Sequence, residues 1–302
     1  SMGVRQACPP CREKLPLGTE TMFANGMELF LSMKKHTEER VDGSWPPLSR
    51  DLQRTMDEAV RLWSGAAEQG HADAGYHLGV IFEVGQGVEQ SDSKAAECYE
   101  KAADAGHAQA QFNLGVMHFE GFGVKQNYLK AKAAWEKAAA QEHADAQYNL
   151  GSLYSEGHGV DQNYSKALRW FQKAAKLGNV DAQYRMGRMY MNGPGILFSK
   201  SDGVEQSDSK AFAWFEKAAN QGCAEAQFNL AILYEEGRGV EQSDSMALRL
   251  FGMASTTGVR SADELARRRI AAIIARRRSS TSSPSSPDAE DEDTSTTPPA
   301  CS

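Results

Sequence analysis

Apolar and polar residues alternate along the middle of the chain at a spacing that predicts helices in pairs. Between residues 93 and 105, four apolar residues stand at positions i, i+4, i+7 and i+8, which lie on one side of an α-helix. They are Ala95, Tyr99, Ala102 and Ala103. A second helix is predicted from about Ala108 to Glu120, with its apolar rows at Phe112, Val116 and Phe119.

Capping residues delimit both predicted helices. The first helix is predicted to begin near residues 91–93, because a serine or aspartate oxygen accepts a free N–H of the first turn. It is predicted to end at Gly106, since glycine suits the left-handed conformation after a helix. Equivalent starts are Asn127, Asn163, Ser207 and Ser243, and equivalent ends are Gly70, Gly178, Gly222 and Gly258. Glu142 departs from the glycine pattern.

The helix pair recurs along the chain. The tripeptide Lys-Ala-Ala begins at residues 101, 137, 173 and 217, and an aromatic residue stands two positions before each lysine. The spacing is 36 residues twice and then 44, because one loop is eight residues longer. This loop contains the apolar residues 196–198 and ends its apolar run at Phe198. Such self-similarity predicts stacked helix pairs that share one continuous core, as in a solenoid.

Glycines recur inside the second helix of each pair. They are Gly79, Gly115, Gly151 and Gly187, with Ala231 in the last copy. A glycine within a helix costs about 0.5–1 kcal/mol relative to alanine. Four such costs in register indicate a steric reason, and we expect the two helices of one unit to approach closely there.

The repeated motif resembles a known family. Asp145-Ala146-Gln147-Tyr148-Asn149-Leu150-Gly151, followed by Glu156-Gly-x-Gly-Val160, is similar to the Sel-1-like repeat, a relative of the tetratricopeptide repeat. The resemblance covers about residues 57–258. It implies an all-α fold: a right-handed superhelical α/α solenoid of about five to six repeats. It also implies an adaptor whose first helices line a concave surface that holds other proteins.

The repeats set the expected domain organisation. Residues 1–19 are expected to be irregular, and residues 20–56 to form a degenerate half-repeat and linker. The solenoid is expected over residues 57–258, and a capping helix over residues 259–278, with Arg267–Arg269 and Arg276–Arg278 turned away from its apolar stripe. Residues 279–302 are rich in Ser, Thr, Pro and acidic residues, which predicts a disordered tail.

Charge and cysteine content narrow the function. The net charge of -7 and the pI of about 5.6 argue against a globally basic nucleic-acid surface. No apolar stretch reaches the ~20 residues of a membrane helix, and no secretory signal is evident. Five cysteines without a repeated pairing pattern favour a reducing compartment, so we expect a cytoplasmic or nuclear location.

The sequence gives no support for catalysis, so we expect no enzyme, cofactor or small-molecule substrate. The Gly-x-Gly-Val loops follow helices rather than strands, which predicts tight turns and not phosphate binding. His71, His107 and His143 occur once per repeat, so we expect them to begin helices rather than to share a metal ion. Cysteine-rich relatives described as acting on β-lactams carry a cysteine pair in each repeat, whereas Cys98 and Cys223 stand alone here.

Cys8 and Cys11 leave a second function open. Cys8-Pro-Pro-Cys11-Arg12 resembles the last ligand pair of a RING finger, which needs six further ligands to close its zinc sites. The alternative to an N-terminal coil with two free thiols is therefore a RING remnant. In that case the repeats would select substrates for a ubiquitin ligase, and zinc would bind only if the RING were completed upstream.

The expected function is a protein–protein interaction scaffold that binds a partner peptide or helix in the solenoid groove. Its candidate contact residues lie at the third and seventh positions of the first helices, counted from the first alanine of each repeat. They are Arg61, Glu97, Lys101, Lys137, Arg169, Lys173 and Lys217, together with Phe198 in the long loop. The lysines either cover apolar rows with solvated heads or form a basic stripe for an acidic or phosphorylated segment.

Overall fold

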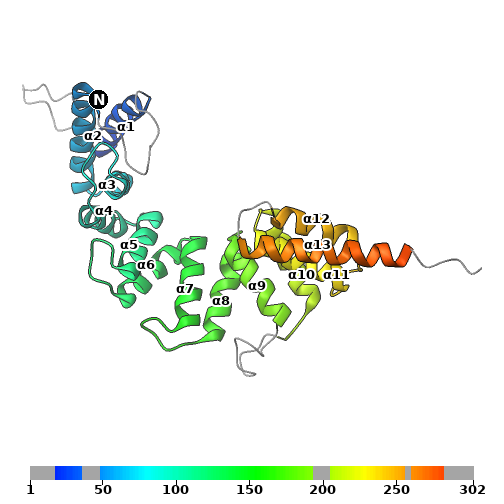
Figure 1. Cartoon of the computed structure of the whole chain (residues 1–302). Helices are drawn as coiled ribbons and strands as arrows, with labels where there is room; N and C mark the ends of the chain where they lie inside the picture. The colour runs from blue at the N-terminus through cyan, green and yellow to red at the C-terminus, as the bar shows by residue number, and fades with distance from the viewer. Residues whose placement is uncertain (1–17, 36–47, 193–204, 256–259, 282–302) are drawn as a thin grey trace, which may run out of the picture. The chain divides into compact units, whose positions relative to one another are not determined.

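The computed structural model describes residues 18–35, 48–192, 205–255 and 260–281. These residues form thirteen α-helices and no strand, which confirms the all-α prediction (Figure 1). None of the helices in these ranges is long and apolar enough to cross a membrane. The chain divides into two compact units, residues 1–218 and 219–302.

The first unit consists of helices that alternate between two roles. The A helices are α2 (Arg50–Glu68), α4 (Asp92–Asp104), α6 (Tyr128–Ala140), α8 (Tyr164–Lys176) and α10 (Asp208–Asn220), of which α10 continues into the second unit. The B helices are α3 (Ala72–Val84), α5 (Ala108–Glu120), α7 (Ala144–Glu156) and α9 (Val180–Asn192). A helix α1 (Thr19–Lys34) precedes them and packs against α2.

The predicted caps are present. Ser91 Oγ accepts from the Lys94 amide at 3.4 Å, and Asn127 Oδ1 accepts from the Lys130 amide at 3.0 Å. Helices α3, α5 and α7 begin after the predicted histidines: in α5, His107 Nδ1 accepts from the amide of residue 110 at 3.1 Å. Each A–B turn holds a residue with positive φ, and at one turn this residue is Glu142 at 60°. The sequence therefore specified the helix boundaries through its capping residues.

The glycines within the B helices lie against aromatic rings, and the contact differs from the one we expected. A Cβ at Gly151 would come within 2.7 Å of the Phe171 ring, and one at Gly187 within 2.5 Å of Phe215. Gly79 meets Tyr99 and Gly115 meets Trp135 in the same way. Each ring belongs to the A helix of the following pair, not to the partner helix of the same pair. The glycines thus make room for packing between neighbouring repeats.

Buried glutamines join the two helices within each pair. The side-chain amide of Gln111 donates to the Ala103 carbonyl at 3.0 Å, which ties the start of α5 to the end of α4. Equivalent bonds of 3.2 Å run from Gln147, Gln183 and Gln227 to the carbonyls eight residues earlier. The bond satisfies a carbonyl at the end of an A helix, which explains the recurring Ala-Gln motif.

Helix α1 repeats the B-helix contact at the start of the chain. A Cβ at Gly26 would meet Trp63 of α2 at 2.6 Å, and the Trp63 indole donates to the Phe23 carbonyl at 3.2 Å. The Trp135 indole makes the same bond to Phe112. Helix α2 begins at Arg50, before the expected solenoid boundary at residue 57.

The second unit contains α11 (Ala224–Glu236), α12 (Asp244–Ser255) and α13 (Arg260–Thr281). Helix α13 packs on α12 and buries Ala266 and Ile273. Two arginines that we expected to face away bind an acidic residue that is only 5 % exposed. Arg269 and Arg276 contact Glu235 at 3.3 and 2.6 Å. The pairing fixes α13 on α11, because a buried carboxylate requires cationic partners.

Candidate partner-binding surface

The A helices of the first unit expose one side, which we call the A-helix face. The predicted contact residues on α4, α6, α8 and α10 are all exposed: Glu97, Lys101, Lys137, Arg169, Lys173 and Lys217. Arg61 on α2 is exposed too, with its guanidinium 2.7 Å from Glu58. The structure therefore brings these side chains to one side of successive helices. Phe198, Cys8 and Cys11 lie outside the described residues.

The A-helix face carries a second row of lysines that our sequence analysis missed. Lys94, Lys130, Lys166 and Lys210 precede the predicted lysines by seven residues, and all four are exposed. Residues seven apart lie on the same side of a helix, so each of these four helices presents two lysines. The signal was available, because this row has the same spacing of 36, 36 and 44 residues.

Aromatic rings hold most lysines of the second row. The ammonium groups of Lys94, Lys166 and Lys210 lie 5.5, 5.2 and 5.4 Å from the ring centroids of Phe82, Tyr154 and Tyr190. Each ring belongs to the preceding B helix. Such cation–π contacts position a lysine without neutralising its charge. At Lys130 the equivalent ring is that of His118.

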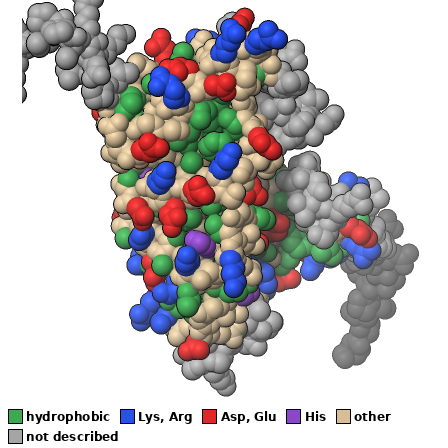
Figure 2. Space-filling model, turned by 90° about the vertical axis from the view of Figure 1, so that its left-hand side faces the viewer, with side chains coloured by type: hydrophobic (Ala, Val, Ile, Leu, Met, Phe, Trp, Pro, Cys, Tyr) green, Lys and Arg blue, Asp and Glu red, His purple; other side chains and the backbone are tan. Residues whose placement is uncertain are grey.

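The predicted lysine row is partly engaged as well. Lys173 and Lys217 lie 4.5 Å from the rings of Trp170 and Trp214, and Lys137 lies 3.7 Å from Asp104. Helix α8 contains four basic residues and no acidic residue, so it is the most basic part of this face. On the face drawn in Figure 2, basic and acidic side chains are interspersed with apolar ones.

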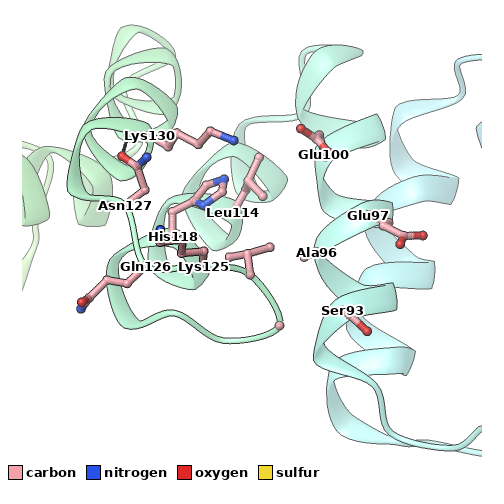
Figure 3. Close-up of a pocket in the computed structure, with 12 residues that line it drawn as sticks. Ser93, Ala96, Glu97, Glu100, Leu114, His118, Lys125, Gln126, Asn127 and Lys130 are labelled. Atoms are coloured by element: carbon pink, nitrogen blue, oxygen red, sulfur yellow. Dashed lines mark hydrogen bonds between the residues drawn. The ribbon is translucent and has the colours of Figure 1, made fainter.

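A groove opens on the A-helix face between α4 and α6, with α5 as its floor (Figure 3). The part lined by Lys125 and Asn127 has a volume of about 450 Å³, and the adjoining part beside Ala134 has a volume of about 160 Å³. Leu114 and His118 come from α5, and Lys130 from α6. Lys130 and Glu100 of α4 point toward one another across the groove. One wall is therefore basic and the other acidic.

His118 lies in this groove with an unsatisfied ring nitrogen. The side chain is 8 % exposed, and its Nδ1 has no hydrogen-bond partner. Burial lowers the pKa of His118, and the positive charge of Lys130 lowers it further. The ring is therefore neutral at neutral pH. A buried polar atom without a partner, such as this Nδ1, is uncommon in folded proteins.

We also searched the described residues for metal ligands and reactive thiols. They contain no group of three or more His, Cys, Asp and Glu side chains that could hold a metal ion. Cys98 and Cys223 are free thiols, and burial raises the pKa of Cys98 to about 11 and that of Cys223 above its ordinary value. Neither thiol is activated as a nucleophile, because the thiolate is the reactive form.

The fold and this surface define an α-helical repeat protein with one exposed helix face. The Sel1 repeat family model matches residues 47–71, 72–107, 108–143, 144–179, 180–223 and 224–258. The chain therefore belongs to the Sel1 repeat family. Proteins of this family generally mediate protein–protein interactions and are typically scaffolds without enzymatic activity.

Solved structures agree with this assignment. The chain is similar to c5321, a protective antigen of uropathogenic Escherichia coli with an SLR fold, at 32% identity and a TM-score of 0.70. The match covers 85% of this chain and 49% of c5321, so the chain spans about half the length of that protein. A Sel1 repeat protein from Oxalobacter formigenes is 29% identical with a TM-score of 0.62, over 80% and 84% of the two chains. No curated protein matches, and none of these findings supports the RING alternative.

Proposed function

We propose that the chain is a non-enzymatic adaptor that binds a peptide or helical segment of a partner protein on its A-helix face. The observation that carries the proposal is the double lysine row on α4, α6, α8 and α10, in a chain whose net charge is -7. A basic surface on an acidic protein attracts acidic partner segments. We place the protein in the cytoplasm or nucleus and assign it no cofactor.

The other side of each pair is less suited to this role. The B helices bury glycine and glutamine against neighbouring A helices, so much of their surface is committed to the solenoid itself. The A helices instead expose alanine or charged residues between their two lysines: Glu97, Ala133, Arg169 and Ala213. Small and charged side chains at these positions leave space for a bound segment beside the lysine heads.

Charge reversal on the A-helix face tests the proposal. Proteins bound by the immobilised chain are first identified from its native cell, and the affinity of a purified partner is then measured by calorimetry. Lys137→Glu combined with Lys173→Glu is expected to weaken binding at least about tenfold and to flatten its salt dependence, with an unchanged melting temperature. The matched control, Arg185→Glu with Arg188→Glu on α9, is expected to keep the wild-type affinity. Equal affinities for both double variants would remove the binding surface from the A-helix face.

A further inference from the structure

The groove between α4 and α6 exists because one repeat uses smaller side chains than the next two. Leu114 on its floor is half-buried, whereas the equivalent residues in the next repeats, Leu150 and Met186, are fully buried. Trp170 packs against the core cluster that contains Leu150, and Trp214 against the cluster that contains Met186. The residue equivalent to these two tryptophans beside Leu114 is Ala134.

A second difference between the repeats widens the α4–α6 groove. His118 stands where the following repeats have Tyr154 and Tyr190. Those tyrosines hold the lysines Lys166 and Lys210 by cation–π contacts. His118 has a smaller ring and an Nδ1 atom without a partner. The repeat therefore lacks the bulk of one tryptophan and part of one tyrosine at adjoining positions, and both gaps open toward the A-helix face.

The two sides of the groove opening carry charges of opposite sign. Lys125 and Lys130 line the α6 side, and Glu97 and Glu100 line the α4 side. At one end the Lys137–Asp104 ion pair spans the two walls. A segment that lies in the groove would gain from an acidic residue next to α6 and a basic residue next to α4. The two walls therefore favour one orientation of the bound segment over the reversed one.

We propose that the α4–α6 groove is a socket for one large apolar side chain of a partner peptide, flanked by an acidic residue toward Lys130 and a basic residue toward Glu100. The apolar side chain covers Leu114, as Trp170 covers the equivalent position in the next repeat. Apolar anchors in a desolvated pocket carry most of the affinity of peptide interfaces. This assignment rests on the proposed function and names the chemistry of the partner.

The chain supplies its own test variants. Ala134→Trp copies Trp170 and Trp214, and His118→Tyr copies Tyr154 and Tyr190, so both are residues that neighbouring repeats accommodate. The combined variant is expected to fill the socket and keep the fold, as checked by its thermal melt. If it does not fold, Ala134→Leu takes its place, because Leu250 occupies the same position in α12.

The probe is a random peptide library displayed on phage and selected on the full wild-type chain. Enriched peptides are expected to share one large apolar residue with an acidic residue beside it. They are expected to lose at least about tenfold in affinity for the filled variant and for Lys130→Glu. Arg185→Glu, on α9 and outside the A-helix face, is the control for charge reversal and is expected to leave their affinity unchanged. Absence of any enriched apolar-acidic pattern, or equal binding to the filled variant, would overturn the proposal.

Two further outcomes separate this proposal from others. If the filled variant keeps its affinity for the native partner but Lys137→Glu with Lys173→Glu loses it, the socket is wrong while the A-helix face stands. If filling the socket instead converts a wild-type dimer to a monomer in sedimentation, a second copy of this chain is the occupant, and the peptide proposal is overturned.

Discussion

Gly151 of α7 lies directly beneath the ring of Phe171 of α8, and a Cβ at that glycine would come within 2.7 Å of the ring. The contact joins one repeat to the next, so it is part of what makes the repeats stack. Gly187 and Phe215 make the same contact in the next repeat. Gly187 follows Gly151 by 36 residues, and Phe215 follows Phe171 by 44 residues. Stability in such arrays is shared between each repeat and its interfaces.

Substitution of this glycine should therefore weaken the solenoid. Gly151→Leu is expected to lower the free energy of unfolding by about 1–3 kcal/mol, because the new side chain collides with Phe171. Chemical denaturation measures the loss. Gly252 of α12 is the control, since a Cβ there has nothing within 4 Å, and Gly252→Ala is expected to stabilise by about 0.5–1 kcal/mol. A Gly151→Leu variant as stable as wild type would show that the interface relaxes freely.

Glu142 is a strained turn residue that glycine should improve. Its φ of 60° is left-handed, and the same turn position in the neighbouring repeats holds Gly106 and Gly178. Glu142→Gly is expected to raise the free energy of unfolding by roughly 1 kcal/mol, because a side chain costs energy in this conformation. Gly178→Ala, with no atom near its Cβ, should lose a similar amount through the backbone alone. Stability changes of the opposite sign would contradict this reading.

The pairing of Glu235 with Arg269 and Arg276 should control the order of α13. Arg276→Ala is expected to destabilise the second unit by about 1.5–3 kcal/mol, because it removes a charged hydrogen bond from a buried carboxylate. Hydrogen exchange of α13 amides would then accelerate. Arg268→Ala, which removes only the exposed pair with Glu264, is expected to change exchange little. Equal protection in both variants would show that apolar packing alone holds α13.

Acid should destabilise the first unit through its histidines. Burial lowers the pKa of His77, His107, His118 and His143. Above the ordinary pKa of histidine, these rings are neutral in both the folded and the unfolded chain. The free energy of unfolding is therefore not reduced by their protonation in that pH range. As the pH falls below about 6.5, the unfolded chain takes up protons more readily than the folded one, and stability declines.

His143→Asn tests this dependence. Asn179 caps α9 at the same position and accepts from the amide of residue 182 at 2.7 Å, so asparagine preserves the cap and removes the titrating ring. The fall in melting temperature between about pH 7 and about pH 5 is expected to be smaller in the variant. An identical pH dependence would assign the acid sensitivity to other groups.

Local signals in the sequence were sufficient for the fold. The caps Ser91 and Asn127 and the glycine ends placed the helices, and the second helix lies at Ala108–Glu120 as predicted. The contacts between repeats could not be read in the same way. Which ring meets Gly115 depends on stacking, and we assigned the contact to the wrong helix.

The candidate site depends on comparisons between repeats rather than on a motif. The groove arises because Ala134 leaves Leu114 uncovered, and these residues stand twenty positions apart on different helices. The ion pairs of Glu235 likewise link residues 34 and 41 positions apart. The lysine row from Lys94 to Lys210 was visible in the sequence, but only the structure shows the aromatic rings on which it rests.

The central claim is that partners bind on the A-helix face, and lysine footprinting with its partner tests this most directly. The folded chain is acetylated with and without a purified partner, and the modification of each lysine is quantified by mass spectrometry. Lys130, Lys137 and Lys173 are expected to lose reactivity when the partner is bound. Lys35, which is exposed at the end of α1 and lies outside the A-helix face, is the internal control and should keep its reactivity. Unchanged reactivity of Lys130, Lys137 and Lys173 in a saturated complex would contradict the account.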